Sequence, residues 1–210
     1  MKAAYHIQIT TTALQSRVSP RALEAILHAN LGQDGWEGLL FHPEFHFDES
    51  RFQDGENYLV AQRESAYAAL KKDDPAPAWQ AYGRLSHAAQ DFYAHSNYVR
   101  LFLEAHPHSL PPQIDPLIPE ILGDSRLHSG HVAWGWELIA YFLPPLAVRL
   151  RDRIPPNTHA GMNLDHPGRG SLFEFALQAA IQRTLYEFRF LLESLNAPAR
   201  QLFCDLPGEG

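Results

Sequence analysis

Three side chains of types that commonly bind metal ions follow one another at intervals of four residues. His87, Asp91 and His95 lie in the segment HAAQDFYAH. In an α-helix this spacing places them along one stripe, each displaced by about 40° from the last. Two imidazoles and a carboxylate on one face can bind a common cation, and zinc accepts both ligand types. The segment therefore predicts a metal site with Asp91 at its centre; the alternative is a polar helix face whose spacing arises by chance.

Further residues that could bind metal lie nearer the start of the chain. His6 opens a segment with helical spacing, Asp34 lies in NLGQDG, and His46 lies in HPEFHFD. Each is a weak signal alone, because an isolated loop histidine is more often solvated or engaged in capping. Their order along the chain makes them candidates for the same site as Asp91.

The ordered series resembles the zinc-dependent phospholipase C superfamily. The residues that carry the resemblance are His6, Asp34, the string His46-Phe47-Asp48, the pair His87-x-x-x-Asp91, and His95. That superfamily also contains fungal single-strand nucleases and the heterokaryon-incompatibility (Het-C) proteins. The segment DFYAHSNYV, at 91–99, looks most like the Het-C branch, and the segments LHSG (127–130) and GMNLD (161–165) look like later parts of it.

The resemblance implies a cluster of zinc ions in an α-helical protein. It assigns a first zinc to Asp34, His46, His87 and Asp91, with Asp91 bridging to a second zinc completed by His6 and the amino group of Met1. A third zinc would use His95 with His159 and Asp165, or with His128 or His131 in their place. The family adds a His-x-x-x-Glu or His-x-x-x-Asp pair here, which this sequence lacks apart from His87. We therefore expect two zinc ions and leave the third open.

The same resemblance implies hydrolysis of phosphodiesters by a zinc-activated water. Asp34 and Asp91 would be the catalytic carboxylates, Asp34 as a ligand or a water-orienting base and Asp91 as the bridge that sets the metal spacing. A phospholipid or another small molecule is the favoured substrate, and single-stranded nucleic acid is the competing one. Two other classes stay open, namely a biosynthetic lyase or cyclase that uses the same metal pocket, and a non-catalytic Het-C-like module in which zinc only holds the helices together.

Composition narrows the classes of partner. Seventeen lysines and arginines against twenty-four aspartates and glutamates give a net charge of −7, which disfavours duplex DNA and anionic membranes. The single cysteine, Cys204, excludes an intrachain disulfide and a cysteine-based metal site. The most apolar run, 138–148, is too short to span a bilayer and contains Pro144-Pro145. With no leader evident at the start, we expect a cytoplasmic protein, or alternatively the mature form of a secreted one.

Helical spacing dominates the chain, and alternation typical of strands is hard to find. Ser19 before Pro20 is a favourable start for a helix. The sequence predicts one all-α domain over residues 1–210, a multi-helix bundle with the metal cluster between its helices. Helices are expected over 6–16, 21–30, 55–72, 78–105, 131–153 with a break at the prolines, and 171–196; irregular segments are expected over 31–54 and 155–170, with a connector over 111–119.

Overall fold

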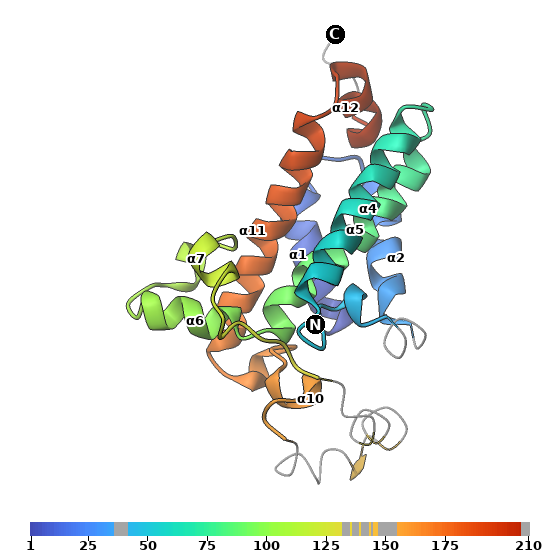
Figure 1. Ribbon diagram of the computed structural model, residues 1–210. Coiled ribbons are helices and arrows are strands. Elements are labelled where there is room, and N and C mark those ends of the chain that lie inside the picture. Colours follow the sequence, from blue (N-terminus) through green and yellow to red (C-terminus); the bar gives the residue numbers. More distant parts are fainter. Residues whose placement is uncertain are drawn as a thin grey trace.

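The computed structural model describes residues 1–35, 42–131 and 155–206, together with positions 135, 139, 143, 145 and 146. Within these ranges the chain is α-helical, and its only extended pairings are two isolated bridges. The expected all-α bundle is therefore confirmed (Figure 1). The α-helices are α1 (Ala3–Leu14), α2 (Pro20–Leu31), α4 (Phe52–Leu70), α5 (Pro75–His95), α6 (Tyr98–Ala105), α7 (Pro119–Leu122), α10 (His159–Met162), α11 (Leu172–Glu193) and α12 (Ala197–Cys204).

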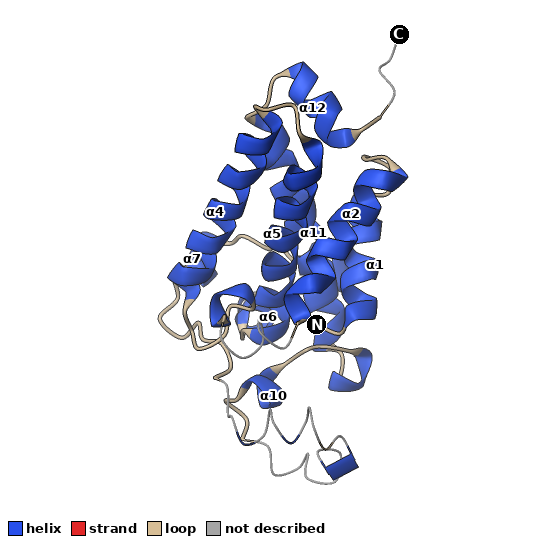
Figure 2. Cartoon of the chain, turned by 90° about the vertical axis from the view of Figure 1, so that its right-hand side faces the viewer, coloured by secondary structure: helices blue, strands red, loops and turns tan. Residues whose placement is uncertain are grey.

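Helix α5 is the central element of the bundle. It packs against α2, α4 and α11, while α1 packs against α11 and α2. Figures 1 and 2 show these five long helices running side by side, with α12 at one end and α10 and the N-terminus at the other. Because neighbours surround α5, almost every side chain from Ala78 to His95 is buried. Polar residues on this helix are therefore held away from water, and each needs a partner.

A glycine allows α2 and α5 to approach closely. A Cβ atom at Gly83 would collide with the carbonyl oxygen of Ile26 and lie 2.8 Å from the Cβ of Ala29. Only a residue without a side chain fits this crossing. The close packing fixes the position of α5 relative to the segment that follows α2, which carries Asp34.

Some of the predicted helix boundaries agree with the structure and others do not. Ser19 caps α2 as expected, since its hydroxyl accepts a hydrogen bond from the backbone N–H of Ala22 at 3.1 Å. The helix expected over 78–105 is instead two helices, because Ser96 is extended and forms a bridge with Ser129. Serine and asparagine side chains compete with the helical backbone for hydrogen bonds, which explains the break. The helix expected over 131–153 lies almost wholly outside the described residues.

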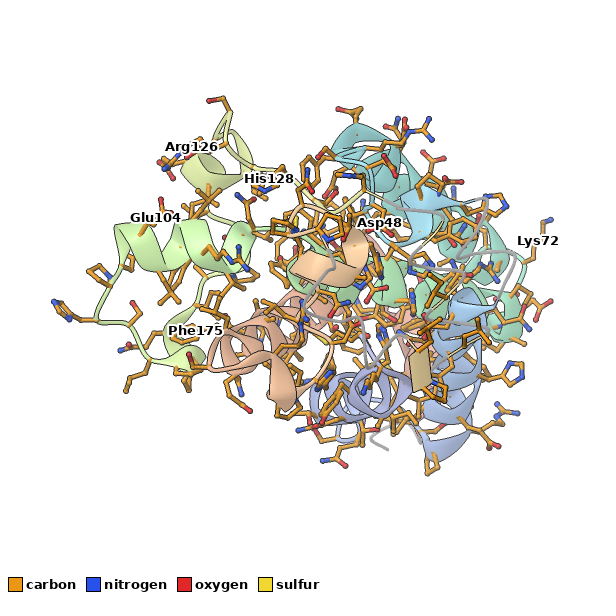
Figure 3. All side chains as sticks on the ribbon, turned by 90° about the horizontal axis from the view of Figure 1, so that it is seen from below. Asp48, Lys72, Glu104, Arg126, His128 and Phe175 are labelled. Carbon is orange, nitrogen blue, oxygen red and sulfur yellow. The ribbon has the colours of Figure 1, made fainter. Side chains whose placement is uncertain are left out.

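Among the described residues, no helix is long and apolar enough to cross a membrane. Seen along the bundle from the end that carries α10, Asp48 lies near the middle of the molecule (Figure 3). Glu104 and Arg126, by contrast, lie at the edge beside α6 and α7. In this view Asp48 therefore lies over the bundle rather than at the side formed by α6 and α7.

Candidate metal centre

The carboxyl-terminal half of α5 carries the stripe predicted from the sequence. His87 and Asp91 are fully buried, and His95 is 3% exposed. A stripe of this kind would normally be apolar in a central helix, because an unpaired charge is costly to bury. The burial of a carboxylate between two imidazoles therefore marks this end of α5 as a site.

His6 lies on the face of helix α1 that packs into the core. His6, Ile9, Thr10 and Ala13 are all buried, at the spacing of one helix face. The Nε2 atom of His6 lies 3.3 Å from Oδ1 of Asp91. The histidine thus reaches the α5 stripe from the neighbouring helix.

Two irregular segments add Asp34 and His46. Asp34 ends the 3₁₀ turn Gly32–Asp34 directly after α2, and Oδ1 of its partly exposed carboxylate lies 3.6 Å from Nε2 of His87. His46 follows the 3₁₀ turn Pro43–Phe45 and is 1% exposed. Its Nδ1 atom lies 2.8 Å from Oδ2 of Asp91 and 3.3 Å from Nε2 of His87. The structure therefore brings together the five residues that we call group A: His6, Asp34, His46, His87 and Asp91.

A second set of residues adjoins the first. Nδ1 of His159 lies 2.9 Å from both carboxylate oxygens of Asp48, and the ring of His159 packs edge-on against that of His95 at 4.2 Å. Nε2 of His95 lies 3.4 Å from Oδ1 of Asp165. We call these four residues group B: Asp48, His95, His159 and Asp165.

Asp91 contacts residues of both groups, and one of its oxygens, Oδ1, faces both. Oδ2 faces His46 and His87, the latter at 3.1 Å. Oδ1 faces His6 and, at 3.8 Å, Nε2 of His95. The sequence predicts that Asp91 bridges a site at His46 and His87 to a site at His6, and its two oxygens face these two sets of residues; the contact of Oδ1 with His95 reaches group B in addition.

A strained loop places Asp48. Phe47, Glu49 and Ser50 all have positive φ angles, of 54°, 60° and 54°. Each such residue costs on the order of 1–3 kcal/mol and persists only where its surroundings hold it. Here the backbone N–H of Glu49 donates to the carbonyl of Gly130 at 3.0 Å, and Ser50 and Ser129 exchange two backbone-to-hydroxyl hydrogen bonds. These hydrogen bonds hold the loop in a conformation in which the carboxylate of Asp48 faces His159 and His95.

A third segment brings His159 and Asp165 to the end of α5. The N–H of Gly130 donates to the carbonyl of His95 at 3.1 Å, and the N–H of Leu164 donates to that of Ala94 at 2.8 Å. A Cβ atom at Gly130 would lie 2.6 Å from the Cα of His159, so the glycine allows this close approach. Backbone hydrogen bonds therefore fix the segment onto the last turn of α5.

The spacing of the ligand atoms suits a small tetrahedral cation. Two ligand atoms that are each about 2 Å from a tetrahedral zinc lie roughly 3.3 Å apart. Nε2 of His6 lies 3.3 Å from Oδ1 of Asp91, and Nε2 of His87 lies 3.1 Å from Oδ2 of Asp91. Nε2 of His95 lies 3.4 Å from Oδ1 of Asp165. Imidazole nitrogen and carboxylate oxygen suit zinc and its neighbours in the first transition row. The arrangement can therefore hold a divalent transition-metal ion in each group.

Several buried polar atoms of the cluster have no hydrogen-bond partner. They include Nε2 of His6, Nδ1 of His87 and Oδ1 of Asp165. Buried polar atoms are normally satisfied, so each of these needs an explanation. Nε2 of His6 and Oδ1 of Asp165 face other ligand-type atoms, at 3.3 and 3.4 Å. A cation between such atoms would satisfy them; without one, Oδ1 of Asp165 has only ionic contacts, with the amino group of Met1 at 3.3 Å and with His95.

The protonation states also suit metal binding. Burial would raise the pKa of Asp91, but the amino group of Met1, and then His95 and His87, outweigh it and hold that pKa well below its usual range. Burial and the neighbouring His6 lower the pKa of His87 well below its usual value. Burial and the charge of Asp91 raise the pKa of Asp34. At neutral pH, Asp91 is a carboxylate and His87 a neutral imidazole, the forms that bind metal.

The amino group of Met1 lies against Asp91 and 3.3 Å from Oδ1 of Asp165. Burial lowers its pKa, but these two carboxylates outweigh burial and raise the pKa to about 11. Among the described residues, no lysine or arginine side chain pairs with the four carboxylates of groups A and B. The cluster therefore attracts positive charge.

Not every residue considered from the sequence lies in the cluster. His128 and His131 are exposed, and the Nδ1 of His128 faces the carbonyl of Arg126, so neither takes the place of His159. Asp48 was missed as a ligand-type residue. Its signal was the short spacing His46-Phe47-Asp48, which places two side chains of this type in one loop.

An all-α bundle with a buried histidine–aspartate cluster at one end defines the class of this protein as a helical domain with a candidate metal centre. The chain belongs to the family of VWA7 N-terminal domains, whose family model matches residues 2–111. That match includes all of group A together with Asp48 and His95.

Similar curated proteins carry the same name. The chain is 36% identical over 99 residues to mouse von Willebrand factor A domain-containing protein 7 and 37% identical over 99 residues to the human protein. Each match covers 47% of this chain but only 11% of the relative. The rat protein is 34% identical over 103 residues, which are 49% of this chain and 12% of the relative. No solved structure matches the chain.

These findings correct the family inferred from the sequence. The resemblance to the zinc-dependent phospholipase C superfamily and its Het-C branch is wrong, because the family model and the relatives identify a VWA7 N-terminal domain. The phospholipase C-like hydrolysis and the Het-C assignment drawn from that resemblance are wrong with it. The error has a physical reason: histidine and aspartate at i, i+4 and i+8 define a helical face suited to metal, and such a face is not specific to one family.

Proposed function

We propose that this domain binds divalent transition-metal ions at groups A and B, with zinc as the first ion to test. One observation carries the proposal. Four carboxylates converge on five imidazoles at the end of α5, and no lysine or arginine of the described ranges neutralises them. The amino group of Met1 supplies one positive charge against Asp91 and Asp165. Burying the remaining carboxylate charge without a compensating partner costs several kcal/mol, and a bound cation reduces that cost.

The ligand types support a transition metal over calcium or magnesium. Calcium and magnesium take mainly oxygen ligands, whereas these groups combine imidazole nitrogen with carboxylate oxygen. The contacts of Asp91 support more than one ion, because Oδ2 faces His46 and His87 while Oδ1 faces His6 and, at 3.8 Å, His95 of group B.

Such ions would join parts of the chain that are far apart in sequence. Group A joins α1, α5 and the segments around Asp34 and His46; group B joins α5 to the loop at Asp48 and to α10. Because the ligands come together only in the folded chain, metal binding adds to the free energy of unfolding. We therefore propose that the ions hold this end of the bundle together.

The test is the metal content of the untagged protein, measured by plasma mass spectrometry after equilibration with zinc and desalting. We expect two zinc ions per chain in the wild type and loss of at least one in Asp91→Asn. The matched control is Asp124→Asn, which removes an exposed carboxylate that pairs with Arg126 instead. Helix content by circular dichroism shows that each variant is folded. A folded wild type that retains no metal would overturn the proposal.

Thermal unfolding gives a second readout. A ligand present at 100 times its Kd stabilises the folded state by about 2.7 kcal/mol, which for a chain of this size raises Tm by roughly 5–11 °C. We expect chelation to lower the Tm of the wild type by a similar number of degrees and to leave the Tm of Asp91→Asn almost unchanged. An equal effect on both proteins would contradict the proposal.

A further inference from the structure

Gln90 lies directly beside the candidate metal centre and makes four hydrogen bonds. It is fully buried on α5, one residue before Asp91. Its Oε1 atom lies 2.6 Å from Nδ1 of His6 and 3.3 Å from Nδ2 of Asn30. Its Nε2 atom donates to the hydroxyls of Thr10 at 3.0 Å and Thr184 at 3.1 Å. Every polar atom of the side chain is therefore occupied.

The hydroxyl of Thr184 fixes the orientation of the amide of Gln90. Thr184 donates its own hydrogen to the carbonyl of Ala180 at 2.8 Å. Its oxygen must then accept from Gln90, which places the amide nitrogen on the side of the threonines. The amide oxygen of Gln90 therefore faces His6.

Asn30 independently gives the same orientation. The hydroxyl of Ser86 donates to the carbonyl of Gly83 at 2.9 Å, so it accepts from Nδ2 of Asn30 at 3.0 Å. The same Nδ2 group donates its second hydrogen to Gln90. Both hydroxyls, on two different helices, thus assign Oε1 of Gln90 as an acceptor.

An acceptor facing Nδ1 of His6 requires a hydrogen on that nitrogen. In a neutral imidazole the other nitrogen, Nε2, then carries the lone pair. Nε2 is buried without a hydrogen-bond partner and lies 3.3 Å from Oδ1 of Asp91. The lone pair of His6 is therefore directed at the place where a group A ion would bind.

We propose that Gln90 is a positioning residue that holds His6 in the Nδ1–H form, so that Nε2 is presented to the metal ion. The inference rests on the proposed metal-binding function, and it adds a residue that does not itself contact the ion. Hydrogen bonds of this kind fix the ring orientation and the tautomer of metal-binding histidines, and their loss typically costs 10–100-fold in metal affinity.

Two substitutions separate the acceptor from the volume of the side chain. Gln90→Met keeps a similar volume and removes the oxygen, whereas Gln90→Glu keeps an oxygen that accepts from Nδ1. We expect zinc affinity, measured by competition with a chromogenic chelator, to fall by about 10–100-fold in Gln90→Met and to stay close to wild type in Gln90→Glu. The matched control is Tyr82→Phe, which removes a buried hydrogen bond of α5, from the hydroxyl of Tyr82 to the carbonyl of Thr184 at 2.7 Å, and leaves the polar atoms of Gln90 and His6 unchanged. It should lower stability without lowering affinity.

Nitrogen-15 NMR of the imidazole rings tests the tautomer directly in the metal-free protein. We expect the hydrogen of His6 on Nδ1 in the wild type and a shift towards the Nε2–H form in Gln90→Met. An Nε2–H tautomer in the wild type, or unchanged zinc affinity in Gln90→Met, would overturn the inference. A wild type that binds no zinc yet shows the Nδ1–H form would overturn the proposed function and leave the hydrogen-bond assignment standing. The two failures are thus distinguishable.

Discussion

Nδ1 of His46 lies 2.8 Å from Oδ2 of Asp91, although the two residues are 45 positions apart in the sequence. This contact attaches an irregular segment to the central helix. It also directs one oxygen of the carboxylate towards His46 and His87, leaving the other oxygen to face His6 and His95.

Replacing His46 with phenylalanine should weaken metal binding at group A. His46→Phe keeps a ring of similar size and removes both nitrogens, so we expect a loss of at least about tenfold in zinc affinity. Isothermal titration calorimetry measures the change. The control is His42→Phe in the same segment, a half-exposed histidine that pairs with Glu44 instead. Equal affinities for the two variants would contradict the assignment of His46 to group A.

Group B should be separable from group A. His159→Gln removes the imidazole that lies 2.9 Å from Asp48, so we expect one of two zinc ions to be lost and the other retained. Metal content by plasma mass spectrometry gives the count. His128→Gln changes an exposed histidine in a nearby loop and should keep both ions. Loss of both ions in folded His159→Gln would show that the two groups form a single site.

Acid should destabilise the metal-free domain through His87. Burial and the neighbouring His6 hold the pKa of His87 well below the ordinary value of 6.5. Below pH 6.5 the unfolded chain therefore binds a proton at His87 that the folded chain does not, and stability falls as the pH falls. The expected loss is about 1.4 kcal/mol for each pH unit over which folded His87 stays neutral.

Urea unfolding in the presence of a chelator at pH 7.5, 6.5 and 5.5 measures this dependence. Between pH 6.5 and 5.5 the free energy of unfolding should fall less in His87→Gln than in the wild type, by up to about 1.4 kcal/mol. An identical pH dependence in the two proteins would show that His87 does not titrate differently on folding.

Gly83→Ala should destabilise the bundle. Alanine favours a helix over glycine by about 1 kcal/mol, but here its methyl group would collide with the carbonyl of Ile26. Separating α2 from α5 to make room should cost about 1–3 kcal/mol net, measured by chemical denaturation. Gly32→Ala is the matched control, because a Cβ atom there meets nothing within 4 Å. A neutral or stabilising Gly83→Ala would mean that α2 and α5 separate freely.

The parts of the site that lie within one helix could be predicted from the sequence. The positions of His87, Asp91 and His95 follow from helical spacing alone, and Ser19 before Pro20 correctly marks the start of α2. Contacts between distant segments could not be predicted in this way. The break after α5 depends on Ser96 pairing with Ser129, and the place of His159, rather than His128, depends on hydrogen bonds made by Gly130.

The side-chain orientations of Asp48 and Gln90 could not be predicted from the sequence either. The orientation of Asp48 depends on three left-handed residues held by a loop some 80 positions away, and the local sequence does not show that contact. The role of Gln90 depends on which of its atoms faces His6, and that is decided by the hydroxyl groups of Ser86 on α5 and Thr184 on α11.

The separation between ligands along the chain has a consequence for the order of folding. His87, Asp91 and His95 align as soon as α5 forms, because helix formation is local and fast. Asp48 and His159 are 111 positions apart, so their meeting requires the closure of a long loop. The contact of His46 with Asp91 spans only 45 positions and should therefore form earlier, and metal capture that needs both Asp48 and His159 should report a later stage of refolding.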